Sequence, residues 1–323
     1  MPTIANADLP GHCIHAGFIS NTPMFADAGG SVFRLEGAIK ETAAHQGLLC
    51  ATETPDRRLL VTGGEDGKVV AINASGETKD IGSIPRKWIN SVATGPNGIA
   101  FSSGKTAVYV ETSGKTHEQT FDRSIEGVAL APKGTRLALS RYNGVTLTFP
   151  GTQGKPVELE WKGAHNSVCF SPDGRYVITS MQENALHGWR IEDGKHMRMA
   201  GYPAKIKSWS WSAKGRWLAT SGAEAAIVWP FHFKDGPMGK APLELGTRAN
   251  MKVTAVACHP AEEVVAVGFN DGMILAVRFA DSKEVLLRRG GKGALTSMSW
   301  DQGGFRLAFG SETGDCGVID IAG

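Results

Sequence analysis

The chain has 323 residues, of which 41 % are apolar, and its 34 basic residues nearly balance its 32 acidic residues. This balance gives no global electrostatic attraction to nucleic acid or to an anionic membrane. No stretch approaches the ~18 consecutive apolar residues that a membrane-spanning helix requires. The five cysteines are an odd number scattered along the chain, which argues against a disulfide framework and for a reducing compartment. The N-terminal residues lack a basic region followed by an apolar core, so we expect no secretory signal and a cytoplasmic protein.

The predicted elements are short strands from one end of the chain to the other. Residues 3–7 form the first, and residues 13–37 form a first three-strand unit, the least typical of the series. Later apolar runs of four to six residues, such as those at 59–62 and 264–267, are rich in β-branched residues and end at Gly, Pro, Asn or Asp. The 41 glycines fit this interpretation, because glycine permits the positive φ angles of tight turns.

The clearest unit is residues 166–195. Its first strand, 167–170, ends at a Ser-Pro-Asp-Gly turn, and strands at 175–179, 185–191 and 195–200 follow. The position of Pro172 in this turn recurs eight times, at intervals of 35 to 47 residues. These anchors are Ser20, Pro55, Pro96, Pro132, Pro172, Ala213, Pro260 and Gln302. The interval matches the ~40–45-residue period of a four-stranded propeller blade.

The two ends of the chain are predicted to share one blade. The last unit supplies strands only at 295–301, 305–310 and 317–321, so its fourth strand is missing, and residues 3–7 are free to take that place. Such closure removes exposed sheet edges. We therefore predict one all-β domain over residues 1–323, a single β-propeller of four-stranded antiparallel blades. Eight blades are favoured, with seven as the alternative.

Segments 127–140, 167–180 and 255–277 resemble WD40 repeats, and the resemblance extends over essentially the whole chain. The pattern departs from that family in two respects. The Trp-Asp pair is absent from the third strands, where Arg190 follows Trp189 and Pro230 follows Trp229. The Gly-His pair survives only at Gly11-His12 and, loosely, before His165. The resemblance implies a docking platform for other proteins, although a fold does not fix a function.

Sites for metals and cofactors are not expected. The His and Cys residues near positions 12–15, 165–169 and 258–259 lack the recurring Cys-x-x-Cys or His-x-x-x-His spacing of a zinc site. No phosphate-binding loop or catalytic constellation is recognisable, so we expect no enzyme. The eight tryptophans are expected to pack between blades, with Trp88 and Trp161 as the exceptions.

Basic residues concentrate in the loops between blades, which share one rim with the turns between second and third strands; we call it the top rim. Its candidate partner-binding residues are Arg86, Lys87, Trp88, Arg123, His165, Lys205, Lys207, Lys252 and Lys292. One hypothesis is that this rim docks an acidic peptide or protein segment. The competing interpretation is that these side chains pair with acids in the neighbouring turns, which would contribute only ~0–1 kcal/mol each.

A second candidate surface is the loop at residues 230–242, which we call the bottom loop and which produces the longest interval between anchors. Phe231, Phe233 and Met238 in this loop either fold back onto the blade or form a protruding contact site.

The favoured function is a non-catalytic protein-interaction scaffold that is monomeric by itself and binds another protein or peptide. A small-ligand binder or enzyme using the central channel is the alternative. Nucleic-acid binding through the basic loops is less favoured, because acids are interleaved with the bases.

Overall fold

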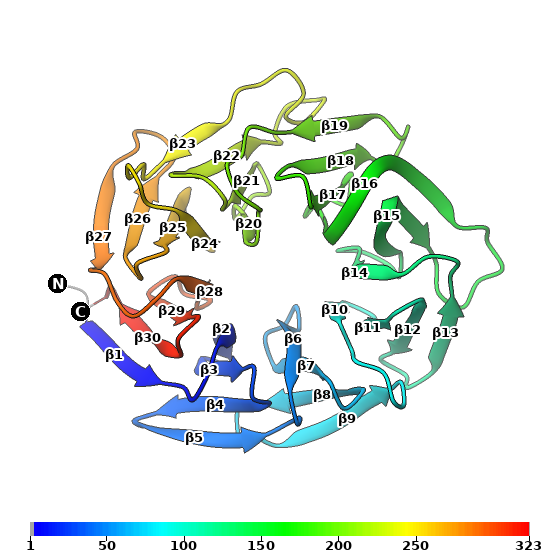
Figure 1. The fold of residues 1–323 in the computed structure, drawn as a ribbon, viewed down its shortest axis with the longest axis horizontal. Coiled ribbons are helices and arrows are strands. Elements are labelled where there is room, and N and C mark those ends of the chain that lie inside the picture. Colours follow the sequence, from blue (N-terminus) through cyan, green and yellow to red (C-terminus); the bar gives the residue numbers. More distant parts are fainter. Residues whose placement is uncertain (1–2, 323) are drawn as a thin grey trace. The chain divides into compact units, whose positions relative to one another are not determined.

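The computed structural model describes residues 3–322, which fall into two compact units. The central unit is Ala43–Ala200, and the terminal unit combines Met1–Thr42 with Gly201–Gly323. Every regular element in the described residues is a β-strand (Figure 1). No helix in that part of the chain is long and apolar enough to cross a membrane.

The central unit contains two four-stranded antiparallel sheets and one six-stranded sheet. The first has the order β6 (Leu48–Glu53), β7 (Leu59–Gly64), β8 (Lys68–Asn73) and β9 (Thr78–Ser83). The second has the order β10 (Ser91–Gly95), β11 (Gly98–Ser103), β12 (Thr106–Glu111) and β13 (Thr116–Thr120). The third has the order β14 (Ile125–Leu130), β15 (Leu137–Thr148), β16 (Val157–Phe170), β17 (Tyr176–Met181), β18 (Leu186–Arg190) and β19 (His196–Met199).

The terminal unit contains four four-stranded antiparallel sheets. One has the order β2 (Cys13–Ile19), β3 (Thr22–Asp27), β4 (Ser31–Glu36) and β5 (Ala38–Ala43). The second has the order β20 (Trp209–Trp211), β21 (Trp217–Thr220), β22 (Ala226–Pro230) and β23 (Leu243–Leu245). The third has the order β24 (Val253–Cys258), β25 (Val264–Phe269), β26 (Ile274–Arg278) and β27 (Glu284–Arg288). The last has the order β1 (Thr3–Asp8), β30 (Asp315–Asp320), β29 (Arg306–Ser311) and β28 (Leu295–Trp300).

This last sheet confirms the prediction that the N-terminal strand completes the last blade. Strand β1 pairs with β30 in an unbroken antiparallel register from Thr3 opposite Asp320 to Asp8 opposite Asp315. A backbone hydrogen bond from Leu9 to Gly314 (2.9 Å) extends the pairing, and Leu9 is itself buried.

The favoured count of eight blades was wrong, and the alternative of seven holds, because the described residues form seven sheets. The sequence units anchored at Pro132 and Pro172 share the six-stranded sheet. Strand β15 turns at a register shift between Tyr142 and Gly144 without leaving the sheet. Strand β16 is paired with β15 up to Ala164 and with β17 from His165 onward, so no gap separates the two units.

Burial follows the position of each strand in its sheet. In the first sheet of the central unit, β7 and β8 are almost entirely buried, whereas the outer strand β9 is polar and largely exposed. The sheets of this unit pack through apolar clusters, one of which joins Val61, Val69 and Ile89 to Phe101 and Val108. These packed clusters hold the strands of the central unit in place and thereby fix the loops that connect them.

Candidate docking surface

A short loop of the central unit, residues 84–90 between β9 and β10, carries three of the predicted rim residues. Ile84 and Ile89 are buried and fix its two ends in the core. Their backbone N–H groups donate to the carbonyl oxygens of Gly67 (2.8 Å) and Gly64 (3.0 Å) in the neighbouring hairpin. At Gly67 a Cβ atom would lie 2.5 Å from the Ile84 carbonyl oxygen, so only glycine permits this close approach. The loop is therefore held rigidly against the β7–β8 turn.

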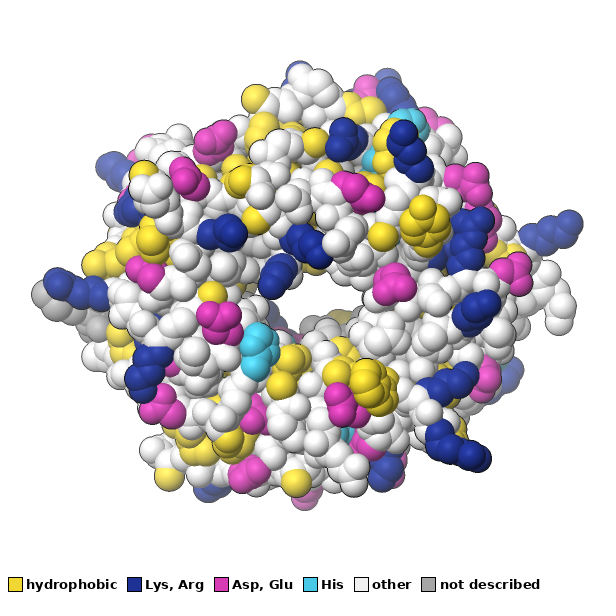
Figure 2. Space-filling view, in the orientation of Figure 1, with side chains coloured by type: hydrophobic (Ala, Val, Ile, Leu, Met, Phe, Trp, Pro, Cys, Tyr) yellow, Lys and Arg dark blue, Asp and Glu magenta, His cyan; other side chains and the backbone are white. Residues whose placement is uncertain are grey.

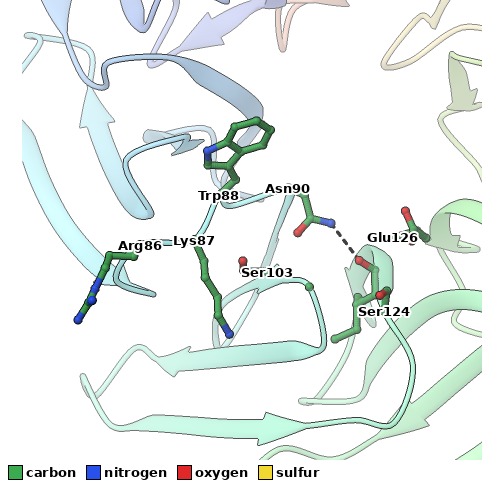
Figure 3. Close-up of a pocket in the computed structure, with 9 residues that line it drawn as sticks. Arg86, Lys87, Trp88, Asn90, Ser103, Ser124 and Glu126 are labelled. Carbon is green, nitrogen blue, oxygen red and sulfur yellow. Dashed lines mark hydrogen bonds between the residues drawn. The ribbon is translucent and has the colours of Figure 1, made fainter.

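Arg86, Lys87 and Trp88 occupy the outward side of this loop. All three are exposed, and Trp88 has 62 % of its surface in contact with solvent. In Figure 3 the Trp88 ring and the Lys87 side chain project in opposite directions from the loop, and Arg86 points away from both. Arg86 adopts a left-handed backbone conformation (φ 62°), which turns the chain sharply just before the exposed tryptophan.

These residues line one side of an open cavity of about 590 Å³. The opposite side is formed by Ser124, Ile125 and Glu126 at the start of β14. Asn90 joins the two sides, because its Nδ2 donates to the Ile125 carbonyl oxygen at 2.9 Å (Figure 3). The cavity thus has a fixed frame, with two exposed cations and one exposed carboxylate along its border. Sequence reasoning missed Asn90, Ser124 and Glu126, since an isolated polar loop residue carries no signal of its own.

The structure also bears on the idea that rim cations pair with neighbouring acids. Within residues 3–322, neither Arg86 nor Lys87 forms an ion pair. Arg123 donates from Nη1 to the Tyr142 carbonyl oxygen at 3.2 Å instead of to a carboxylate. The cations of the Trp88 loop are therefore available for a ligand.

The other predicted cations lie in the terminal unit and behave differently from one another. Lys205, Lys207 and Lys252 are exposed, and the latter two form no ion pair within the described part of the chain. Lys292 does form one, with its Nζ 3.2 Å from Asp8. In Figure 2, basic and acidic side chains are mixed over the face drawn rather than gathered by sign. Pairing therefore accounts for some of the predicted rim cations only.

The prediction that His165 belongs to a partner-binding rim was wrong. Its side chain is completely buried, with Nδ1 2.7 Å from the Thr179 hydroxyl and Nε2 3.0 Å from the Trp161 carbonyl oxygen. Burial lowers the pKa of the imidazole. Trp161, expected to lie outside the core, is only partly buried and stacks on buried His187 at 4.2 Å.

Sequence reasoning also missed a histidine network at the start of the central unit. His45 Nδ1 lies 3.0 Å from Asp66, and its Nε2 lies 2.9 Å from the Thr62 hydroxyl. This arrangement links the segment before β6 to the β7–β8 hairpin that supports the Trp88 loop. A His in the linker followed by Thr in the second strand and Asp in the next turn is the signal that could have identified it.

Of the three residues predicted in the bottom loop, Phe231 folds back onto the blade. Phe231 is buried and packs edge-on against Trp211 at 4.8 Å, so its prediction as a partner-binding residue was wrong. Phe233 is 39 % exposed, with the Lys240 ammonium 4.7 Å from its ring centre, and Met238 is half-buried. Phe233 and Met238 retain surface that a partner could reach.

No group of three or more His, Cys, Asp or Glu side chains within residues 3–322 is arranged to hold a metal ion. Burial raises the pKa of the Cys50 and Cys258 thiols to about 12, which leaves them protonated and unreactive at neutral pH.

Comparison with known proteins gives matches to repeat proteins. The family described as "WD domain, G-beta repeat" matches residues 157–189. Echinoderm microtubule-associated protein-like 2 from Rattus norvegicus is 24 % identical over 160 residues, which are 46 % of this chain and 24 % of that protein. The match thus spans about a quarter of the relative's length.

Two solved structures are similar over most of the chain. The computationally designed Ika8 protein has a TM-score of 0.77 at 17 % identity, covering 97 % of this chain and 98 % of the designed one. The β-propeller domain of Cps50 (Swd1) from Myceliophteria thermophila has a TM-score of 0.66 at 15 % identity, covering 84 % of this chain and 96 % of that domain. These likenesses establish the fold, a β-propeller with four-stranded antiparallel blades.

Proposed function

We propose that this chain, a WD40-repeat β-propeller, is a non-catalytic docking protein that binds another protein through the Trp88 loop. The observation that carries the proposal is the 62 % exposure of Trp88 on a loop anchored by Ile84 and Ile89. Tryptophan is enriched among the few residues that dominate binding energy at protein interfaces. A loop that is already rigid loses little conformational entropy when it binds, so less of the favourable contact free energy is offset by ordering.

The charge around Trp88 supports an acidic partner. Arg86 and Lys87 make no ion pair within the described residues, and Glu126 is the one carboxylate lining the same cavity. A segment with Asp or Glu beside an apolar residue would meet both features of the surface, because complementary charge raises the association rate and excludes partners of the wrong sign.

The proposal extends to the state of the whole chain. Residues 1–323 form a single propeller domain that is monomeric by itself and resides in the cytoplasm. The five cysteines, all free thiols, support a reducing compartment.

The experiment compares three purified proteins as bait: wild type, Trp88→Ala and Phe305→Ala. Phe305 is the matched control, because it is an aromatic residue of similar exposure (58 %) in the terminal unit. Mass spectrometry identifies the proteins retained by wild type, and titration then gives their dissociation constants. We expect Trp88→Ala to raise the dissociation constant of the partner that binds the Trp88 loop at least about 30-fold, because a dominant contact residue is lost. Phe305→Ala should leave this dissociation constant unchanged.

Lys87→Glu tests the contribution of charge separately. It should weaken binding of the same partner, and more strongly at low salt. Unchanged melting of each variant establishes that the fold is intact. Equal retention of every partner by wild type and Trp88→Ala would overturn the proposal.

A further inference from the structure

A second cavity of about 510 Å³ opens at the far end of β10 from the Trp88 loop, where three turns of the central unit meet. The turns are those between β6 and β7, between β10 and β11, and between β12 and β13. We call this cavity the turn groove. Its volume lies within the ~300–1,000 Å³ range of ligand sites, and it is less open than the cavity beside Trp88.

The floor of the turn groove is apolar. Leu59, Ile81, Ile99 and Val110 line it, and all four are only partly buried. They pack on the same apolar cluster that contains Phe101 and joins the two sheets. The floor is thus the exposed end of a core, and a ligand that covered it would bury apolar surface, with a gain of roughly 25 cal/mol per Å².

The turns around this floor are held in place by hydrogen bonds. The Asn97 carbonyl oxygen accepts from the Tyr109 hydroxyl (2.9 Å) and from the Thr112 backbone N–H (3.0 Å). The Thr54 hydroxyl accepts from the Leu59 backbone N–H at 3.1 Å. At Gly98 a Cβ atom would lie 2.3 Å from the Val110 carbonyl oxygen, so a side chain there would not fit. The groove is therefore formed before any ligand arrives.

The border of the turn groove is acidic. Asp56, Asp80 and Glu111 line it against a single cation, Lys79. The hydrogen bond from the Thr54 hydroxyl lowers the pKa of Asp56, and that from His117 lowers the pKa of Glu111. Both carboxyl groups are consequently ionised at neutral pH. Asp80 is exposed and forms no ion pair within residues 3–322.

We propose that the turn groove binds an extended segment of another protein in which one aliphatic or aromatic side chain is flanked by Lys or Arg. The apolar side chain would cover Leu59, Ile81 and Ile99, while the flanking cations would meet Asp80 and Glu111. The charge requirement is opposite to that of the Trp88 loop, so the groove selects a different class of segment. This inference does not rest on the proposed function, since Trp88 lies at the other end of the same sheets.

The experiment uses the full chain and two fluorescein-labelled peptide libraries. Each peptide has a fixed Leu or Phe; its flanking positions are Lys or Arg in the first library and Glu in the second. Fluorescence polarisation gives the dissociation constants at low and high salt. We expect the basic library to bind, the acidic library to bind at least about 10-fold more weakly, and high salt to weaken the basic peptides, because the charges are exposed.

Three charge variants locate the binding. Asp80→Lys should weaken binding of the basic peptides about 10-fold, and Lys79→Glu should strengthen their binding. Glu118→Lys is the matched control, because Glu118 is an exposed residue of β13 that does not line the groove. Thr112→Trp places a bulky, uncharged side chain at the groove and should block peptide binding without altering the charge of the groove.

Trp88→Ala should leave peptide binding unchanged, which separates this inference from the docking proposal. Equal binding of the two libraries would overturn the proposal, as would an Asp80→Lys variant that binds like wild type. Absence of binding by the basic library at millimolar concentration would overturn it as well.

Discussion

His187 gives the sharpest prediction for stability, because it is fully buried and both of its ring nitrogens lack a hydrogen-bond partner within residues 3–322. It stacks on Trp161 at 4.2 Å and lies 5.3 Å from His196. Burial, together with the nearby His196 and His165, lowers its pKa from 6.5 to about 3. The folded protein therefore holds this imidazole neutral across the range in which the unfolded chain binds a proton.

The consequence is a loss of stability as pH falls below about 6.5. One pKa unit corresponds to about 1.36 kcal/mol, so between pH 7 and pH 5 the unfolded state gains about 2 kcal/mol from protonating His187. Below pH 3 the loss from this residue stops growing, because the folded state then binds the proton too.

The assay is urea unfolding followed by tryptophan fluorescence at pH 7 and pH 5. His187→Phe keeps an aromatic ring in the same stack but cannot titrate, so it should lose about 2 kcal/mol less than wild type over this interval. His232→Phe is the matched control at an exposed histidine and should keep the wild-type dependence. If His187→Phe and wild type lost the same stability, the assignment of a neutral buried imidazole would be refuted.

Two further predictions concern the architecture. Deleting residues 1–9 removes β1, whose six residues pair with β30. We therefore expect the melting temperature to fall by more than about 5 °C in calorimetry. An unchanged transition would mean that β1 contributes nothing to stability. His45→Ala removes the contacts to Asp66 and Thr62 and should cost about 1–3 kcal/mol in urea unfolding, and a loss well below that range would show that the network is not stabilising.

Much of the fold was predictable because each turn carries local chemistry. The Ser-Pro-Asp-Gly turn of residues 171–174 forms as expected, with the Gly174 backbone N–H donating to the Ser171 carbonyl oxygen at 2.8 Å. The pairing of β1 with β30 followed from a missing strand at one end and a spare strand at the other. Both inferences used features that a single sequence displays directly.

The number of sheets was not predictable in the same way. Asn143 adopts a left-handed conformation (φ 65°) at the register shift within β15, and β16 remains paired on both sides of Ala164. Periodicity counts sequence units but does not show whether a strand is interrupted between two of them.

The candidate site was predictable in part. Trp88 was expected to lie outside the core because it falls in a basic loop between blades, and the structure agrees. The burial of His165 was not expected, because it was placed in a loop between blades, whereas it lies within β16 and pairs with Met181. The turn groove combines residues from three separate turns, so no local pattern could indicate it.

The joining of β1 to β30 also affects how the protein is made. The two strands are separated by about 300 residues, so the N-terminal strand leaves the ribosome long before its neighbour exists. At ~5–20 residues per second, the wait is roughly 15–60 s. During this time β1 is an unpaired strand with free backbone groups, open to mispairing with other nascent chains. Chaperone demand should therefore be highest late in translation, and slowing the synthesis of the last sheet should lower the yield of native protein.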